Sequence, residues 1–351
     1  MKYTDLSEAQ QQELLKQINI ATRIAKKNIE KDWWVTQVLR AIFELPYAGH
    51  LSFKGGTSLS KAWRVIGRFS EDIDIAISRE YLGFSGELSR TQVNDKLRRA
   101  ACSFVRNTLS NDIKQRLILN GIREDMFTVH VNVTSVSTVD PEVIYVEYKT
   151  LFPFDDYVQN MVKIEVGGRS MSEPIQQVML SSIVDETLTS SLIAEPPFAV
   201  SVVLPERTFL EKVMLLHEEF SKPIADVRTE RMSRHLYDIE RMLHTDIAER
   251  ALQNEQLYRA VVEHRRKFVG LKDFDYDTLY PQSLSLEIPA NVLPLWRKDY
   301  ENMRQSMIYG ASVPFDEMMQ QMRQLNERIR QLPYCKQNNN RKYNAIDAKV
   351  R

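Results

Sequence analysis

The chain has 351 residues with as many acidic as basic side chains, so its formal net charge is zero. This length allows two domains, or one large core with an appendage. No apolar run of about 18 residues is present, which excludes an ordinary membrane helix. The first residues form no apolar signal region, so we expect a cytoplasmic protein. Two distant cysteines, Cys102 and Cys335, indicate neither a disulfide framework nor a zinc site.

The first part of the chain alternates between helical and strand patterns. A helix is predicted from residue 7 to about 25, because Ser7 and Gln10 have the spacing of a capping box. Further elements are expected in chain order as a helix over 28–43, a strand over 51–53, a helix over 58–66 and a strand over 72–77.

The middle of the chain predicts a sheet. Residues 90–121 are charged and helical, and we interpret them as a two-helix insertion. Four strands are expected over 127–134, 143–148, 161–166 and 198–203. The fold class is therefore α/β, with a mixed sheet flanked by helices.

The sequence changes character after Pro205. Helical patterns continue to residue 332, apart from an irregular stretch at 270–295, and the last residues are polar. We therefore expect a core over 1–204, a helical domain over 205–334 and a polar tail over 335–351.

The central motif combines two glycines with two carboxylates. In the predicted strand, Asp72 and Asp74 point to the same face because side chains alternate with a period of two. Two neighbouring carboxylates repel one another unless a cation lies between them, and Mg²⁺ suits carboxylate oxygens shared with phosphates. Gly55 and Gly56 allow a close backbone approach to a ligand, and Thr57 or Ser58 then starts a helix that favours an anion.

Each half of this motif also has an ordinary interpretation. A glycine pair can be a simple turn, and an Asp-x-Asp sequence can be a solvated strand edge. The succession of both within one helix and one turn favours a nucleotide site. The sequence is not a P-loop, because it lacks the spacing Gly-x-x-x-x-Gly-Lys-Ser/Thr.

Residues 53–61 and 68–75 together resemble the AbiEii/AbiGii toxin family of nucleotidyltransferases. That family belongs to the DNA polymerase β-like superfamily, whose signature is Gly-Gly/Ser, a short helix and Asp-x-Asp. Further resemblances follow in order at residues 30–34, 162–170, 206–212, 234–239 and 296–300. The resemblance implies a polymerase β-like core with a C-terminal helical domain.

The resemblance implies a third carboxylate at the metal site, and Glu165 is the candidate. A carboxylate on a central strand is costly to bury unless it is paired or bound to metal. The alternative is a salt bridge from Glu165 to Lys163 or Arg169. Asp140, Asp155 and Asp156 lie in predicted loops and are weaker candidates.

The later motifs add Lys212 and Asp238. The resemblance implies that Lys212 reaches the triphosphate and that Asp238 orients Lys212 or the acceptor hydroxyl. The ordinary alternatives are a solvated lysine and an i, i+4 ion pair between Arg234 and Asp238. We also expect Lys61 to bind the triphosphate together with Gly55, Gly56, Thr57 and Ser58.

Arg228, Arg231 and Arg234 recur every three residues, which predicts one basic helical face with Arg241 further along. Such a face is either simply solvated or a track for the phosphates of a tRNA acceptor stem.

The resemblance implies a magnesium-dependent toxin of a toxin–antitoxin or phage-defence pair. It would transfer a nucleoside monophosphate from a nucleoside triphosphate to an acceptor hydroxyl, for which the 3′ end of tRNA is the candidate, and an antitoxin would be encoded nearby. Two alternatives remain at this point. One is a nucleotidyltransferase that modifies a small molecule of the antibiotic type, and the other is a non-catalytic module that binds a nucleotide or a partner.

Overall fold

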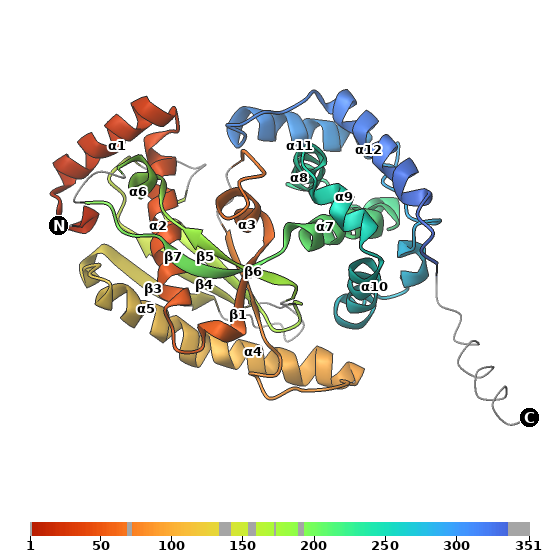
Figure 1. Ribbon diagram of the computed structural model, residues 1–351, viewed down its shortest axis with the longest axis horizontal. Helices are drawn as coiled ribbons and strands as arrows, with labels where there is room; N and C mark the ends of the chain where they lie inside the picture. Colours follow the sequence, from red (N-terminus) through yellow and green to blue (C-terminus); the bar gives the residue numbers. More distant parts are fainter. Residues whose placement is uncertain are drawn as a thin grey trace, which may run out of the picture. The chain divides into compact units, whose positions relative to one another are not determined.

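A computed structural model describes residues 2–68, 72–132, 142–153, 159–171, 173–188 and 193–335 (Figure 1). It divides into two compact units. The first comprises residues 1–208 and 304–312, and the second comprises residues 209–303 and 313–351. None of the described helices is both long and apolar enough to cross a membrane.

The first unit is built on a mixed seven-stranded sheet with the order β3-β4-β5-β2-β1-β7-β6. Its strands are β1 (Leu51–Lys54), β2 (Asp72–Ile77), β3 (Phe127–Asn132), β4 (Val143–Tyr148), β5 (Met161–Gly167), β6 (Ile175–Leu180) and β7 (Phe198–Val203). Strand β2 lies at the centre, antiparallel to β1 and parallel to β5. The predicted mixed α/β class is confirmed.

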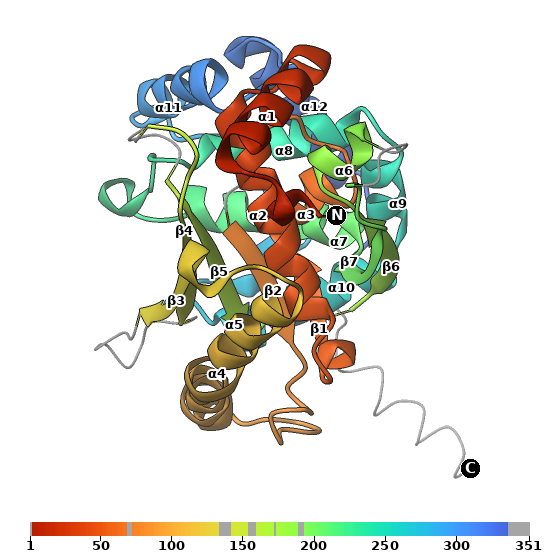
Figure 2. The same ribbon diagram turned by 90° about the vertical axis from the view of Figure 1, so that its left-hand side faces the viewer.

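Several helices accompany this sheet. They are α1 (Glu8–Thr22), α2 (Lys26–Phe43), α3 (Gly55–Lys61), α4 (Arg98–Phe104), α5 (Ser110–Leu119), α6 (Ile183–Thr187) and the start of α7 (Pro205–Phe220). Helix α2 runs across the sheet and contacts β5 and β7, with α1 and α5 packed beside it (Figures 1 and 2).

The two faces of the central strands differ in burial. Ile73 and Ile75 on β2 are fully buried in the core, as are Ile164 and Val166 on β5. Asp74 lies between the two isoleucines of β2 and Glu165 between Ile164 and Val166 of β5, and both of these polar residues are only partly buried. One face of the sheet therefore forms the core, and the other is left for polar side chains.

The second unit is helical. It contains the remainder of α7, then α8 (Ser233–Leu243), α9 (Ile247–Gln253), α10 (Glu255–His264), most of α11 (Leu293–Ser306) and α12 (Phe315–Arg330). Trp296 and Tyr300 are fully buried in it. A buried ion pair joins Arg265 to Glu218, with 2.6 Å between Nε and Oε1.

Local chemistry explains the elements that were predicted well. Ser7 caps α1 by accepting a hydrogen bond from the Gln10 amide, and the Gln10 side chain accepts one from the Ser7 amide, so the capping box is confirmed. Strands β2, β4 and β7 have the predicted bounds.

Two predicted elements differ from the structure, and two observed elements were not predicted. Residues 90–119 form one continuous helical segment with π-helical turns at Gln92–Leu97 and Val105–Leu109, not two helices, because no glycine or proline interrupts them. Helix α3 begins at Gly55 and ends at Lys61, earlier than expected at both ends. Strand β6 and helix α6 were not predicted.

The expected division of the chain also differs in two segments. Residues 205–208 and 304–312 belong to the first unit, although the expected domain over 205–334 included them. Residues 336–351 of the expected polar tail lie outside the described residues, as do Asp140, Asp155 and Asp156.

We expect Ile164→Ala to lower the free energy of unfolding by about 2–5 kcal/mol, because it removes a fully buried side chain from the centre of the sheet. Leu119→Ala is the matched control, since Leu119 is 74 % exposed, and it should change stability by less than about 0.5 kcal/mol. Urea unfolding followed by circular dichroism measures both. Equal losses in the two variants would contradict this view of the core.

Candidate active site

Asp72 and Asp74 lie on the polar face of β2, as the alternation predicted. In the parallel pairing of β2 with β5, Asp72 lies opposite Lys163 and Asp74 lies opposite Glu165. On the other side of β2, Asp74 lies opposite Lys54 of β1. Residues opposite one another in neighbouring strands share a face of the sheet. The pairing therefore gathers three carboxylates and two ammonium-bearing side chains in adjacent rows.

Gly55 lies directly against the carboxylate of Asp74. A Cβ atom at Gly55 would come within 1.9 Å of Asp74 Oδ2, and the φ angle of Gly55 is +77°. Both facts require glycine, since the left-handed region disfavours other residues and no side chain fits beside Asp74. The first glycine of the motif is thus explained by contact with the second aspartate.

The hydroxyl groups of α3 are used within the turn. Thr57 Oγ1 donates a hydrogen bond to the backbone oxygen of Asp72, and Ser58 Oγ donates to the backbone oxygen of Gly55 at 2.8 Å. Both side chains are buried. The Thr57 hydroxyl ties α3 to the beginning of β2, and the Ser58 hydroxyl closes the first turn of α3. Any contact of these two residues with a phosphate would therefore come from their backbone.

Lys61, at the end of α3, is paired within the first unit. Its ammonium lies 2.6 Å from Oδ1 of Asp32 on α2, and the other oxygen of Asp32 accepts a hydrogen bond from the Ile183 amide at 2.7 Å. The Lys61 side chain is only 7 % exposed. The expected contact of Lys61 with a triphosphate stays a prediction and would require this pair to open.

Lys163 stands among the carboxylates of the polar face. Its ammonium donates a hydrogen bond to Glu165 Oε1 and lies 3.9 Å from Asp72 Oδ2. Burial lowers the pKa of Lys163, but the hydrogen bond to Glu165 and the negative charges of Asp72 and Glu165 outweigh it and raise that pKa above its usual value. Lys163 is therefore a cation that partly neutralises this site.

The carboxylates of the polar face are the candidate ligands of a metal ion. Among the described residues, no three or more Asp, Glu, His or Cys side chains are grouped so that they could hold an ion. Glu165 is instead held by Lys163, which was the ordinary alternative for this residue, so its role as a third metal ligand stays a prediction. Asp72 and Asp74 still fit Mg²⁺, because that ion commonly takes one or two carboxylates and completes its shell with water and substrate phosphates.

The structure brings Lys212 and Asp238 together in the second unit. Lys212 Nζ on α7 lies 2.9 Å from Asp238 Oδ2 on α8, and His235 Nδ1 lies 3.3 Å from the same ammonium. The side chain of Asp238 is completely buried and that of Lys212 is 9 % exposed. The solvated lysine of the ordinary interpretation is therefore wrong.

The predicted basic helical face is wrong as well. Helix α8 begins only at Ser233, so Arg228 and Arg231 precede it and cannot share a helical face with Arg234. Arg228 is bound to Glu219 at 2.6 Å, and Arg231 has a φ angle of +57°. Residues 227–232 are not helical, and the three-residue spacing of the arginines could not reveal this.

Comparison with known families adds an independent result. The model of the family described as "Nucleotidyl transferase AbiEii toxin, Type IV TA system" matches residues 37–321, which is most of the chain. The chain belongs to the AbiEii family. It is accordingly a nucleotidyltransferase toxin of a type IV toxin–antitoxin system, and the resemblance of the motifs is confirmed.

Solved structures similar to this AbiEii protein include MenT4, a nucleotidyltransferase toxin from Mycobacterium tuberculosis H37Rv. It is 15 % identical, with 93 % of this chain and 99 % of that chain covered and a TM-score of 0.43. JHP933 from Helicobacter pylori is 13 % identical, with coverages of 79 % and 94 % and a TM-score of 0.32. No curated protein matched the sequence.

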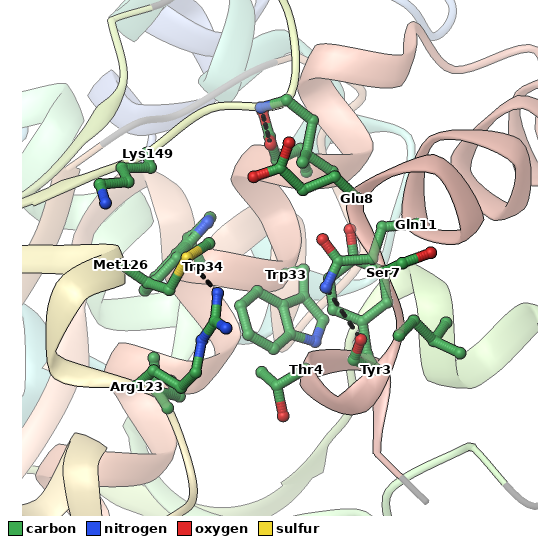
Figure 3. Close-up of a pocket in the computed structure, with 14 residues that line it drawn as sticks. Tyr3, Thr4, Ser7, Glu8, Gln11, Trp33, Trp34, Arg123, Met126 and Lys149 are labelled. Carbon is green, nitrogen blue, oxygen red and sulfur yellow. Dashed lines mark hydrogen bonds between the residues drawn. The ribbon is translucent and has the colours of Figure 1, made fainter.

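A separate cavity of about 260 Å³ lies in the first unit of the AbiEii protein (Figure 3). Trp33 and Trp34 form part of its wall, and Arg123 and Lys149 lie at it as well. None of the residues expected in the nucleotide site lines this cavity. The cavity is therefore distinct from the candidate nucleotide site.

Gly55→Ala should lower nucleotidyl transfer about 10²-fold or more, because the added methyl group displaces the Asp74 carboxylate. Gly83→Ala is the matched control, since Gly83 also has a positive φ of +87° but no atom within 4 Å of an added Cβ. Both variants should lose about 1–2 kcal/mol of stability from the left-handed backbone. Steady-state rates beside thermal unfolding separate the two effects, and an equal loss of activity in both variants would contradict the contact.

Lys212→Met should destabilise the protein by about 3–5 kcal/mol, because it removes the ammonium that pairs with the fully buried Asp238 carboxylate. The double variant Lys212→Met/Asp238→Leu removes both charges and should recover most of that stability. Denaturant unfolding measures the two. A single variant as stable as the unaltered protein would show that this pair contributes nothing to folding.

Proposed function

We propose that this AbiEii protein transfers a nucleoside monophosphate from a nucleoside triphosphate to a hydroxyl group at the 3′ end of tRNA, with Mg²⁺ as cofactor. The observation that carries the proposal is the packing of Gly55 against Asp74, beside Asp72 on the same strand face. This arrangement leaves the backbone of the glycine turn and two carboxylates accessible to one ligand, as a metal-bound triphosphate requires.

The proposed roles follow from these positions. Asp72 and Asp74 hold the metal, which when bound would neutralise charge on the phosphates and on the leaving group. Gly55 and Gly56 offer a backbone surface without side chains to the triphosphate, with Thr57 and Ser58 fixing that turn. These groups act by positioning and electrostatics, which supply most of the acceleration in phosphoryl transfer.

The reaction forms one bond and breaks another. The acceptor oxygen bonds to the α-phosphorus, the bond from that phosphorus to the oxygen bridging to the β-phosphate breaks, and pyrophosphate leaves. The hydroxyl proton is released to a base or to water. The buried pair of Lys212 and Asp238 is proposed to assist, with Lys212 neutralising charge on the pyrophosphate and Asp238 orienting Lys212.

Glu165 and Lys61 could contact the metal or the triphosphate only after their ion pairs open. Each is ion-paired in the structure, Glu165 with Lys163 and Lys61 with Asp32. We propose that Glu165 becomes a metal ligand when Lys163 moves to substrate phosphates. Lys61 would reach the triphosphate only after leaving Asp32.

The choice of an RNA acceptor rests on what a toxin must do to stop growth, since the net charge of the chain is zero and does not indicate a nucleic-acid partner. A toxin must modify something whose loss stops growth, and a blocked tRNA 3′ end would prevent aminoacylation. The proposed setting is the cytoplasm, where tRNA and nucleoside triphosphates occur, and the type IV assignment implies an antitoxin.

Incubation with Mg²⁺, total bacterial tRNA and each α-labelled nucleoside triphosphate should label tRNA, with one nucleotide preferred. Asp74→Asn should reduce the rate about 10²- to 10³-fold, since it removes one of the two carboxylates proposed to hold the metal, and EDTA should abolish labelling. Asp125→Asn is the control, because the side chain of Asp125 is 61 % exposed in the same unit.

The other outcomes of the labelling experiment distinguish the alternative functions. Label on a small molecule of a cell extract, with none on tRNA, would replace the tRNA proposal by the antibiotic-type activity. Label that persists in Asp74→Asn and in EDTA would refute the metal site. No transfer to any acceptor would leave a module that only binds a nucleotide or partner.

A further inference from the structure

The last residues of α11 and the loop that follows them belong to the first unit. Residues 304–312 are grouped with that unit, whereas the helical residues before and after them belong to the second. We call residues 304–312 the return segment. It is the only part of the described chain beyond residue 208 that belongs with the sheet.

The return segment is fixed to the loop that leads into β2. The amides of Tyr309 and Gly310 both donate to the backbone oxygen of Gly67, each at 2.9 Å. Ile308 forms an antiparallel bridge with Arg68, four residues before Asp72. A Cβ atom at Gly310 would lie 2.9 Å from Gly67 Cα, so the two backbones are in close contact.

Tyr309 is an exposed aromatic residue of the return segment whose backbone is bound to Gly67. The residue is 53 % exposed. Burial of its hydroxyl end, and then the charge of Asp32, raise the pKa of Tyr309 above its usual value. Asp32 is the residue that binds Lys61 at the end of α3. Tyr309 therefore lies near the end of α3 whose first residue contacts Asp74.

The length of helix α3 suits a nucleotide. Helix α3 has seven residues, and its length is about 10 Å. A nucleotide whose triphosphate lies at Gly55 would have its base at a comparable distance from the phosphates, and the backbone of Tyr309 is bound at Gly67, beyond the end of α3. Aromatic side chains bind bases by stacking, worth about 1–3 kcal/mol per base, and tolerate every base because each has a π-face.

We propose that Tyr309 stacks on the base of the nucleoside triphosphate and that the return segment forms a wall of the nucleotide site. This inference rests on the proposed function, because it needs the triphosphate at the glycine turn. The backbone of Tyr309 is already held on Gly67, so stacking orders few additional groups. The contact would supply affinity for the base without deciding which base is used.

The test compares ligands with and without a base. Binding of ATP, GTP, CTP, UTP and inorganic tripolyphosphate, each with Mg²⁺, is measured by calorimetry on the full chain. In Tyr309→Ala the Kd for the nucleotides should rise about 5- to 150-fold, the range that 1–3 kcal/mol of stacking corresponds to. The Kd for tripolyphosphate should not change.

Two further variants make the result specific. Tyr309→Phe keeps the ring and should bind nucleotides within about threefold of the unaltered protein, since stacking depends on the π-face. Tyr81→Ala is the control for loss of an exposed tyrosine, because Tyr81 is 38 % exposed and stacks on His50. It should bind every ligand normally.

The inference is overturned if Tyr309→Ala binds nucleotides normally, or if it weakens tripolyphosphate as much as nucleotides. It is also overturned if the unaltered protein binds tripolyphosphate as tightly as ATP, a result that leaves the proposed function intact. Failure to bind either ligand with Mg²⁺ refutes the proposed function as well, so the two failures are distinguishable.

Discussion

The close approach of Gly55 to Asp74 is the contact on which the candidate site depends. It fixes where β1 ends, because a side chain at this position would collide with the carboxylate. It also fixes the direction of α3, whose Thr57 hydroxyl returns to the backbone of Asp72. A turn, a helix and a strand are thus held together by one position that tolerates no Cβ atom. The chemistry proposed for the AbiEii protein uses the same position, since a bare backbone is what a phosphate can approach.

One face of the central sheet packs in the core, and the other carries the polar residues of the candidate site. Ile73 and Ile164 face the core, while Asp72 and Lys163, their neighbours along the same strands, share the polar face. Carboxylates held this close together repel one another, and Lys163 offsets part of that repulsion in the structure. A cation therefore already stands where the proposed reaction needs positive charge.

The second unit contains a buried pair of opposite charges. Lys212 and Asp238 form a buried pair, in which the cost of desolvating both charges is offset by their close approach. The return segment, by contrast, passes out of the helical part to pair with the loop before β2. Residues late in the sequence thus belong to the sheet unit, and Tyr309 is one of them.

The sequence by itself determined the features that depend on neighbouring residues. The alternation in β2 placed Asp72 and Asp74 on one face, the capping box started α1, and the ordered motifs identified the family. Only the tertiary structure decided the features that depend on distant residues. The pairing of Glu165 with Lys163 needs side-chain rotamers on β5, the capture of Lys61 by Asp32 needs α2 beside α3, and the place of Tyr309 needs a segment far along the chain to return. Short-range periodicity carries no information about such contacts, because they are set by how the elements pack.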